Sequence, residues 1–396
     1  MPSILQNVRS RVQPQRLLEL ARRLISIPSP TGRAGDVLDA LASFLTAEGF
    51  VVDRPAAGHP DAPAVVARLQ TNRPGRTLQW DGHLDTVHLP FVPDRVEGGH
   101  LRGSGSSDMK AGLAAAAEAL LALRDGALLS TGSVLLTAHD LHEAPWGDGR
   151  QFDRLILDGI AGEAVMIPES LCDHLPTVGR GQACWKVTLR RPGPPVHEVM
   201  RSREEPEVIT AGARLVSEFA KLEEKLRLQP GPMGLSPSVF VGRIQSGEIY
   251  NQFPQECVLE GTRRWLPGST CDEVGREFRG MIAGCCREMG VTADIEFRQV
   301  RDAFFLDTNH SIVRDFQDSL REITGSPLPF GVKPFVDDGN SVWGLKQAPA
   351  ITHGPRAGGQ HTTEEWVEID DLTRVAIVYA STAIRFCARG PDAQPS

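Results

Sequence analysis

The chain has 396 residues, of which 41% are hydrophobic and 23% charged, a composition typical of a globular protein long enough for two domains. Its formal net charge is -8, and because nucleic acids and anionic membranes attract an excess of Lys and Arg, neither is expected as a partner. The first twenty residues are polar and lack an apolar core, so they resemble neither a secretory signal nor a membrane span, and a cytoplasmic protein is expected.

Helical and strand patterns alternate along the first part of the chain. The spacing of Leu and Ala predicts helices over 16–26 and 34–48, so two helices are expected before the first strand. Further apolar runs predict strands over 64–69, 77–80, 132–138 and 164–167, and helices over 110–123 and 152–158. This β-α-β alternation predicts a mainly parallel sheet with helices on both faces.

The pattern changes after residue 179. Strands are predicted over 183–190, 239–245, 256–263 and 292–300, with helices over 207–228 and 271–289. This β-α-β-β-α-β order is typical of a ferredoxin-like unit. Helix–strand alternation then resumes, with helices over 311–323 and 370–388 and a strand over 348–352. The chain is therefore predicted to form one discontinuous domain, 1–179 and 300–396, interrupted by an inserted domain of residues 180–299.

Two short runs carry the first chemical signal. In Gly82–Val87, which reads GHLDTV, His83 and Asp85 are two residues apart and project to the same face of a strand. Asp85 can therefore accept one ring N–H of His83 while the other ring nitrogen binds a metal. In Ser106–Gly112, which reads SSDMKAG, Asp108 offers a carboxylate from a small-residue loop before an Ala-rich helix.

Three more candidate ligands lie where this topology brings strand ends together. Glu143 and Glu169 follow predicted strands, and His361 lies in a late glycine-containing loop. Two histidines and several carboxylates form a nitrogen and oxygen site that suits zinc, manganese or cobalt better than calcium. The seven cysteines are odd in number and show no C-x-x-C spacing, which disfavours a disulfide framework and a thiolate zinc site.

Several separated motifs occur in one order along nearly the whole chain. They are Gly82–Val87 (G-H-x-D-T-V), Ser107–Gly112 (D-M-K-x-G), Asn251–Pro254 (N-x-x-P), Arg264–Gly268 (R-x-x-P-G), and Gly354-Pro355 followed by His361–Val367 (H-T-x-x-E-x-V). In this ordered set the chain resembles the M20 family of metallopeptidases and deacylases. The resemblance implies an α/β, zinc-exopeptidase-like catalytic domain with an inserted ferredoxin-like α+β lid and dimerisation domain, and a homodimer formed through that lid.

The resemblance also implies roles for single residues. One or two divalent metal ions, with zinc expected first and manganese or cobalt as alternatives, would be bound by five residues: His83, Asp108, Glu143, Glu169 and His361. Asp108 would bridge the two ions, and Asp85 would orient His83. His197 would reach the neighbouring subunit and polarise the substrate carbonyl. Asn251 and Arg264 would hold the carboxylate or carbonyl of the substrate, a task that suits a guanidinium fork.

One segment departs from the family pattern. The family usually carries two adjacent glutamates, a general base followed by a metal ligand, whereas residues 137–147 contain a single glutamate, Glu143. Counting back from Gly147 places Glu143 at the ligand position and His142 at the base position. Counting forward from Thr137 places Asp140 at the base position instead. Glu143 is favoured as the key catalytic carboxylate, with His142 and Asp140 as alternatives for the base.

These residues predict a metal-dependent hydrolase. Metal-activated water would cleave the amide C–N bond of a small N-acyl amino acid or dipeptide-like substrate. Two alternatives remain open: a divergent enzyme that acts on a C–N bond outside peptides, such as that of an aryl amine or amidine, and a metal-binding scaffold that has lost catalysis.

Overall fold

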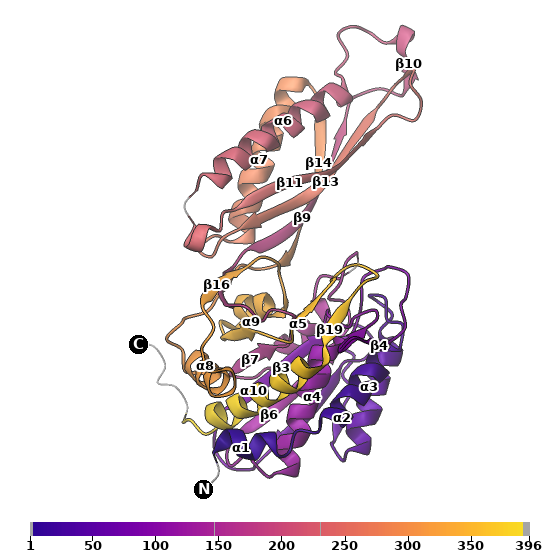
Figure 1. The fold of residues 1–396 in the computed structure, drawn as a ribbon. Helices are drawn as coiled ribbons and strands as arrows, with labels where there is room; N and C mark the ends of the chain where they lie inside the picture. Colours follow the sequence, from indigo (N-terminus) through magenta and orange to yellow (C-terminus); the bar gives the residue numbers. More distant parts are fainter. Residues whose placement is uncertain (1–2, 146, 230, 391–396) are drawn as a thin grey trace. The chain divides into compact units, whose positions relative to one another are not determined.

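The computed structural model describes residues 3–145, 147–229 and 231–390, and the chain forms two compact units (Figure 1). Unit 1 comprises Met1–Thr177, Phe305–Gly331 and Asp337–Ser396, and unit 2 comprises Val178–Phe304 and Val332–Val336. The second short segment of unit 2 was not expected from the sequence. Among the described residues, no helix has both the length and the apolar character needed to cross a membrane.

A six-stranded sheet forms the centre of unit 1. Its order is β1 (Val52–Asp53), β2 (Val65–Gln70), β6 (Ser133–His139), β3 (Thr77–His83), β7 (Ala164–Ile167) and β17 (Ala350–Thr352). The last four strands run parallel, while β1 and β2 are antiparallel to their neighbours. Residues 78–83 of β3 are all buried, as expected for a strand covered on both faces. The predicted mainly parallel α/β architecture is confirmed.

Eight helices of the described chain belong to unit 1. They are α1 (Ile4–Arg9), α2 (Pro14–Ile25), α3 (Gly35–Ala47), α4 (Lys110–Asp125), α5 (Arg150–Leu157), α8 (Ser311–Thr324), α9 (Asp338–Lys346) and α10 (Ile369–Cys387). Three helices precede the first strand, so the prediction of two was wrong. The additional helix, α1, has six residues, too few to show a helical period. Helices α4 and α10 pack on each other and on β3 and β6, whereas α9 packs on β7 and β17.

A small antiparallel sheet in unit 1 includes the two strands on either side of the loop that contains His361. Its strands are β18 (Ala357–Gly358), β19 (Trp366–Glu368), β5 (His100–Arg102) and β4 (Arg95–Glu97). Three further short strands, β8 (Leu175–Gly179), β15 (Phe304–Phe305) and β16 (Phe330–Lys333), lie where the chain passes from one unit to the other.

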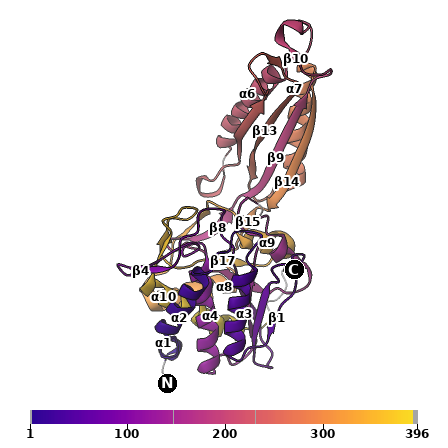
Figure 2. The ribbon, with the colours of Figure 1, turned by 90° about the vertical axis from the view of Figure 1, so that its right-hand side faces the viewer.

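Unit 2 is an antiparallel sheet with two helices (Figure 2). Along the chain it contains β9 (Gly181–Arg190), α6 (Val208–Arg227), β11 (Ser238–Ser246), β13 (Glu256–Trp265), α7 (Cys271–Met289) and β14 (Thr292–Arg301), in the sheet order β11-β13-β9-β14. Trp185, Phe219 and Phe278 form the centre of one hydrophobic cluster between the sheet and both helices. The ferredoxin-like order predicted from the sequence is confirmed. Two short strands, β10 (Val196–His197) and β12 (Gln252–Phe253), pair beside it.

Candidate metal centre

The five predicted ligands all belong to unit 1 and lie at the carboxyl end of a strand or in a loop. His83 is the last residue of β3, Glu143 follows β6, and Glu169 follows β7. Asp108 lies two residues before α4, and His361 lies in the loop between β18 and β19. Because parallel strands end at the same edge of a sheet, residues far apart in the sequence can meet there.

The distances show that the five side chains converge. His83 Nε2 lies 3.0 Å from Asp108 Oδ1 and 3.6 Å from Glu169 Oε1. His361 Nε2 lies 3.4 Å from Asp108 Oδ2 and 3.1 Å from Glu143 Oε1. The two oxygens of Asp108 therefore face one histidine each. Ligand atoms about 2.0–2.1 Å from a tetrahedral zinc ion lie about 3.3–3.4 Å from one another, so these separations and donor types fit a divalent metal.

The carboxylates of this centre crowd one another. Burial, with the charge of Asp108, raises the pKa of Glu169 to about 7 and raises the pKa of Glu143 in the same way. Hydrogen bonds to Asp108 and Glu143 raise the pKa of His361 to about 10. The carboxylates therefore attract positive charge to this centre. Protonated histidines provide such charge, and a divalent cation would provide it in their place.

Asp85 contacts the backbone of the segment that carries Glu143. Its carboxylate accepts the amide N–H of His142 at 3.1 Å and that of Glu143 at 2.8 Å. His83 Nδ1 lies 3.1 Å from the backbone carbonyl of Asp85 and 3.5 Å from its carboxylate. Orientation of His83 by the Asp85 carboxylate stays a prediction, whereas the bonds from Asp85 to the two amides were not expected from the sequence.

Asp140, one alternative for the general base, is engaged elsewhere. It is fully buried, and its oxygens accept the amides of Gly32 at 2.8 Å, Ala34 at 2.9 Å and Leu141 at 2.6 Å. His59 Nε2 lies 3.2 Å from the same carboxylate. These bonds tie together loops that are distant in sequence. The geometry therefore gives Asp140 a structural role.

His142 and Glu143 occupy different environments. Glu143 faces His361, as described above, whereas the ring of His142 stacks on that of His83 with centroids 3.9 Å apart. His142 Nδ1 lies 3.0 Å from the Asp338 carboxylate, and His142 offers a ring nitrogen within 4.8 Å of ligand atoms of His83 and Glu169. Asp338 is the first residue of α9 and was missed by sequence reasoning, since nothing in its local pattern separates it from an ordinary helix-start acid.

Gly112 shows why the motif that follows Asp108 contains a glycine. A Cβ atom at this position would lie 2.0 Å from the carbonyl oxygen of Pro168. Helix α4 therefore approaches the segment just before Glu169 more closely than any side chain allows.

The predicted residues of unit 2 form a separate set. His197 and Asn251 meet, with His197 Nε2 3.1 Å from Asn251 Nδ2, and about half of the His197 side chain is exposed. Arg264 lies on β13, and its Nη1 atom is buried without a hydrogen-bond partner in the described part of the chain. Burial, together with the nearby charge of Arg180, lowers the pKa of Arg264.

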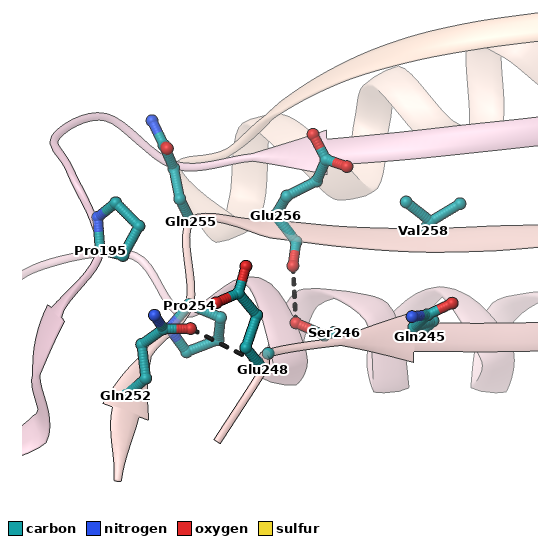
Figure 3. A pocket seen from close by; sticks show the side chains of 10 residues that line it. Pro195, Gln245, Ser246, Glu248, Gln252, Pro254, Gln255, Glu256 and Val258 are labelled. Atoms are coloured by element: carbon teal, nitrogen blue, oxygen red, sulfur yellow. Dashed lines mark hydrogen bonds between the residues drawn. The ribbon is translucent and has the colours of Figure 1, made fainter. Parts of the chain in front are cut away.

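Unit 2 also contains a cavity of about 440 Å³ beside β12 (Figure 3). Its lining is mostly polar and includes Gln245, Glu248, Gln252 and Glu256. The predicted site residues are not among those that line it. The cavity therefore does not mark the candidate metal centre.

A comparison with protein-family models matches residues 80–385 to the peptidase family M20/M25/M40. The chain belongs to this family. As an M20 family member it is a metal-dependent hydrolase that cleaves amide bonds. The chain is also 27% identical over 395 residues to a succinyl-diaminopimelate desuccinylase of Methylorubrum populi, covering 93% of this chain and 98% of the relative.

Solved structures of the M20 family share the fold. A tripeptidase of Staphylococcus aureus is 20% identical with a TM-score of 0.79, covering 96% of this chain and 100% of the other. A dinuclear metal binding peptidase of Bacillus subtilis is 16% identical with a TM-score of 0.68, covering 94% and 97% of the two chains. These likenesses establish the two-unit architecture.

Proposed function

We propose that the chain removes the acyl group from a small N-acyl amino acid, such as an N-succinyl amino acid, or cleaves a dipeptide-like amide. The observation that carries this proposal is the convergence of two histidines and three carboxylates at the end of the sheet of unit 1. The preference for an acylated amino acid is supported by the full-length likeness to a succinyl-diaminopimelate desuccinylase.

The metal ligands in this proposal are His83, Asp108, Glu143, Glu169 and His361. Zinc is proposed as the ion, with manganese and cobalt as alternatives, because the donors are imidazole nitrogens and carboxylate oxygens. Bound by these residues, a divalent ion would supply a water whose pKa is lowered to about 7 and a positive charge that polarises a carbonyl oxygen. Asp108, which faces both histidines, is proposed to bridge two ions.

His142 is proposed to carry the proton during catalysis, and Glu143 to serve as a ligand. Glu143 Oε1 lies 3.1 Å from His361 Nε2, and this proximity supports a ligand role for Glu143. Asp338, at 3.0 Å from His142 Nδ1, accepts the N–H of that nitrogen and so fixes the ring tautomer. The other ring nitrogen can then take a proton from water and return it to the leaving amine.

Substitution separates these two roles. We expect His142→Gln to lower kcat by about 10²- to 10⁴-fold, the usual contribution of a general base, with the metal content unchanged. Glu143→Gln should lower the metal content itself, measured by plasma mass spectrometry. The assignment is wrong if His142→Gln remains fully active, or if Glu143→Gln keeps its metal and loses only turnover.

Substrate recognition is proposed for unit 2. Arg264 would bind the substrate carboxylate, because its buried Nη1 atom lacks a hydrogen-bond partner among the described residues and a guanidinium suits a carboxylate. Asn251 and His197, which contact each other, would bind the scissile carbonyl. A homodimer formed through unit 2 would bring His197 to the partner's site.

Mixing two inactive variants tests that arrangement. His197→Ala and His142→Gln are each expected to be inactive, but a mixed dimer would contain one site with both histidines intact. Co-expression should therefore restore up to about a quarter of the wild-type activity, and sedimentation should show a dimer. Full activity of a monomer, or no restoration in verified mixed dimers, would remove the shared role of His197.

The activity itself is tested on a panel of N-succinyl and N-acetyl amino acids and dipeptides, with zinc, manganese or cobalt added. Asp108→Asn should abolish turnover and metal binding at this centre. Glu364→Gln is the matched control, because Glu364 is exposed in the same loop as His361. If the wild-type protein binds metal but hydrolyses none of these substrates, the proposed substrate class is wrong.

A further inference from the structure

A second polar group lies deeper in unit 1, beneath the candidate metal centre along the same strands. Asp81 and His83 are two residues apart on β3 and project to one face of the sheet. In the parallel pairing of β3 with β6, His139 lies beside His83 and Thr137 lies beside Asp81. Asp338 reaches this face from the start of α9.

The three side chains of Asp81, His139 and Asp338 are fully buried. His139 Nε2 lies 3.4 Å from Asp81 Oδ2 and 3.3 Å from Asp338 Oδ2. Despite this proximity, His139 Nε2 and Asp81 Oδ2 form no hydrogen bond within the described chain. Two buried polar atoms thus lie close to each other without a hydrogen bond. Burying them in this way costs folding free energy unless another group or ion lies between them.

The hydrogen bond made by the other ring nitrogen of His139 indicates which kind of group would fit between these atoms. His139 Nδ1 lies 3.1 Å from the backbone carbonyl of Asp140, and since a carbonyl can only accept, Nδ1 carries a proton. In a neutral ring, Nε2 then presents a lone pair toward two carboxylates. Burial lowers the pKa of His139, but the charges of Asp338 and Asp81 outweigh it and raise that pKa well above its usual value, so the two carboxylates attract positive charge to this point, as a proton on Nε2 or as a metal cation. A divalent ion would balance the charges of both carboxylates.

We propose that Asp81, His139 and Asp338 bind a zinc-class divalent metal ion at a site distinct from the candidate metal centre. Each of the three offers one ligand atom, and these atoms lie within 4.8 Å of one another. The two separations at His139 Nε2 equal the spacing of about 3.3–3.4 Å between ligands of a tetrahedral ion. One nitrogen and two carboxylate oxygens are ligands that zinc accepts.

The surroundings hold two of the ligands in place. The hydroxyl of Thr137 donates to Asp81 Oδ1, leaving Oδ2 to face His139. Gln79 Nε2 in turn donates to Thr137 Oγ1 at 2.8 Å. The ring of Phe152 stacks on His139 with centroids 5.2 Å apart. Fixed partners behind the ligands are typical of metal sites, where they set ligand orientation.

We call the site of Asp81, His139 and Asp338 the inner site and the candidate metal centre the outer centre. Asp338 belongs to the inner site and also contacts His142, which lies beside the outer centre. Asp338 Oδ2 lies 3.3 Å from His139 Nε2 and also 3.0 Å from His142 Nδ1, and Asp338 Oδ1 lies 3.1 Å from the same His142 atom. An ion at the inner site would hold the Asp338 carboxylate in one position and thereby position His142. An ion at the inner site would therefore act by positioning His142. Whether the inner site binds an ion does not depend on which substrate the protein cleaves.

Crystals of the protein produced with added zinc, measured above and below the zinc absorption edge, test the proposal without an activity assay. We expect an anomalous peak about 2.0–2.2 Å from Asp81 Oδ2, His139 Nε2 and Asp338 Oδ2. Peaks confined to the outer centre would overturn the proposal. In that case nitrogen NMR should show both ring nitrogens of His139 protonated, and an imidazolium ion would replace the metal.

Two variants separate the inner from the outer ions by metal counting. Asp81→Asn should contain one zinc ion per chain fewer than the wild type and keep the ions of the outer centre. Asp108→Asn is the matched control, because it should lose outer ions and keep the inner peak. An unchanged zinc content in folded Asp81→Asn would contradict the proposal. If Asp81→Asn fails to fold, the diffraction experiment on the wild-type protein decides alone.

Discussion

We expect His353 to make the stability of unit 1 sensitive to acid. It is fully buried behind the Glu169 segment, and Arg374 donates from Nη1 to its Nε2 atom at 2.9 Å. Because a guanidinium can only donate, Nε2 must keep its lone pair, and the ring must be neutral. Burial, together with the charge of Arg374, lowers the pKa of His353 from 6.5 to about 3.

The sign of the effect follows from proton uptake. Between pH 6.5 and about 3 the unfolded chain binds a proton at this histidine and the folded chain does not. The contribution of His353 to the free energy of unfolding is therefore complete above pH 6.5 and decreases as the pH is lowered. Each pKa unit corresponds to about 1.4 kcal/mol. With these two pKa values, lowering the pH from 7 to 5 should remove about 2 kcal/mol of unfolding free energy through His353 alone.

Urea unfolding of the wild type and of His353→Gln at pH 7 and pH 5 measures this contribution. The glutamine side chain can accept from Arg374 but does not titrate, so the variant should lose about 2 kcal/mol less than the wild type over this interval. His88→Gln is the control for exchanging a histidine for glutamine, because His88 donates to the carbonyl of Thr31 and the amide N–H of glutamine can donate in the same way. Equal losses in wild type and His353→Gln would refute the neutral-ring argument.

Three further results are expected. Gly112→Ala should lower stability by about 1–3 kcal/mol through the clash with Pro168, whereas Gly280→Ala in α7, whose Cβ would meet nothing within 4 Å, should leave the thermal midpoint unchanged or raise it. Asp140→Ala should cost at least about 3 kcal/mol in urea unfolding, because it leaves buried donors unpaired, and a merely inactive but fully stable variant would contradict its structural role. Chelation should lower the thermal midpoint, and added zinc should restore it; an unchanged midpoint would argue against ions bound at the centre.

The sequence predicted the main elements well because their periodicity is strong. The parallel strands and the long helices of both units lie within a few residues of their expected positions. Short elements such as α1 and β10 were missed, because six or two residues carry no measurable period. For these, capping and pairing with distant strands determine the structure.

The candidate site was predictable where a motif carried it. His83, Asp108 and His361 belong to recognisable runs, and the structure places their side chains together. Asp81 and His139 were missed, although one signal was present: polar residues alternate along β3 and β6, which are otherwise buried and apolar. Asp338 lacked any such signal, since only the packing of α9 brings it to His139 and His142.

Asp85 accepts hydrogen bonds from the backbone N–H groups of residues 142 and 143, so the position of the backbone at residue 142 does not depend on which side chain residue 142 carries. The path of the chain through positions 142 and 143 is fixed by backbone N–H groups, which every residue except proline possesses. We therefore expect an exchange of the side chain at position 142 to leave Glu143 in place. A designer could replace His142 with glutamate, glutamine or alanine and compare different proton carriers against a constant set of ligands.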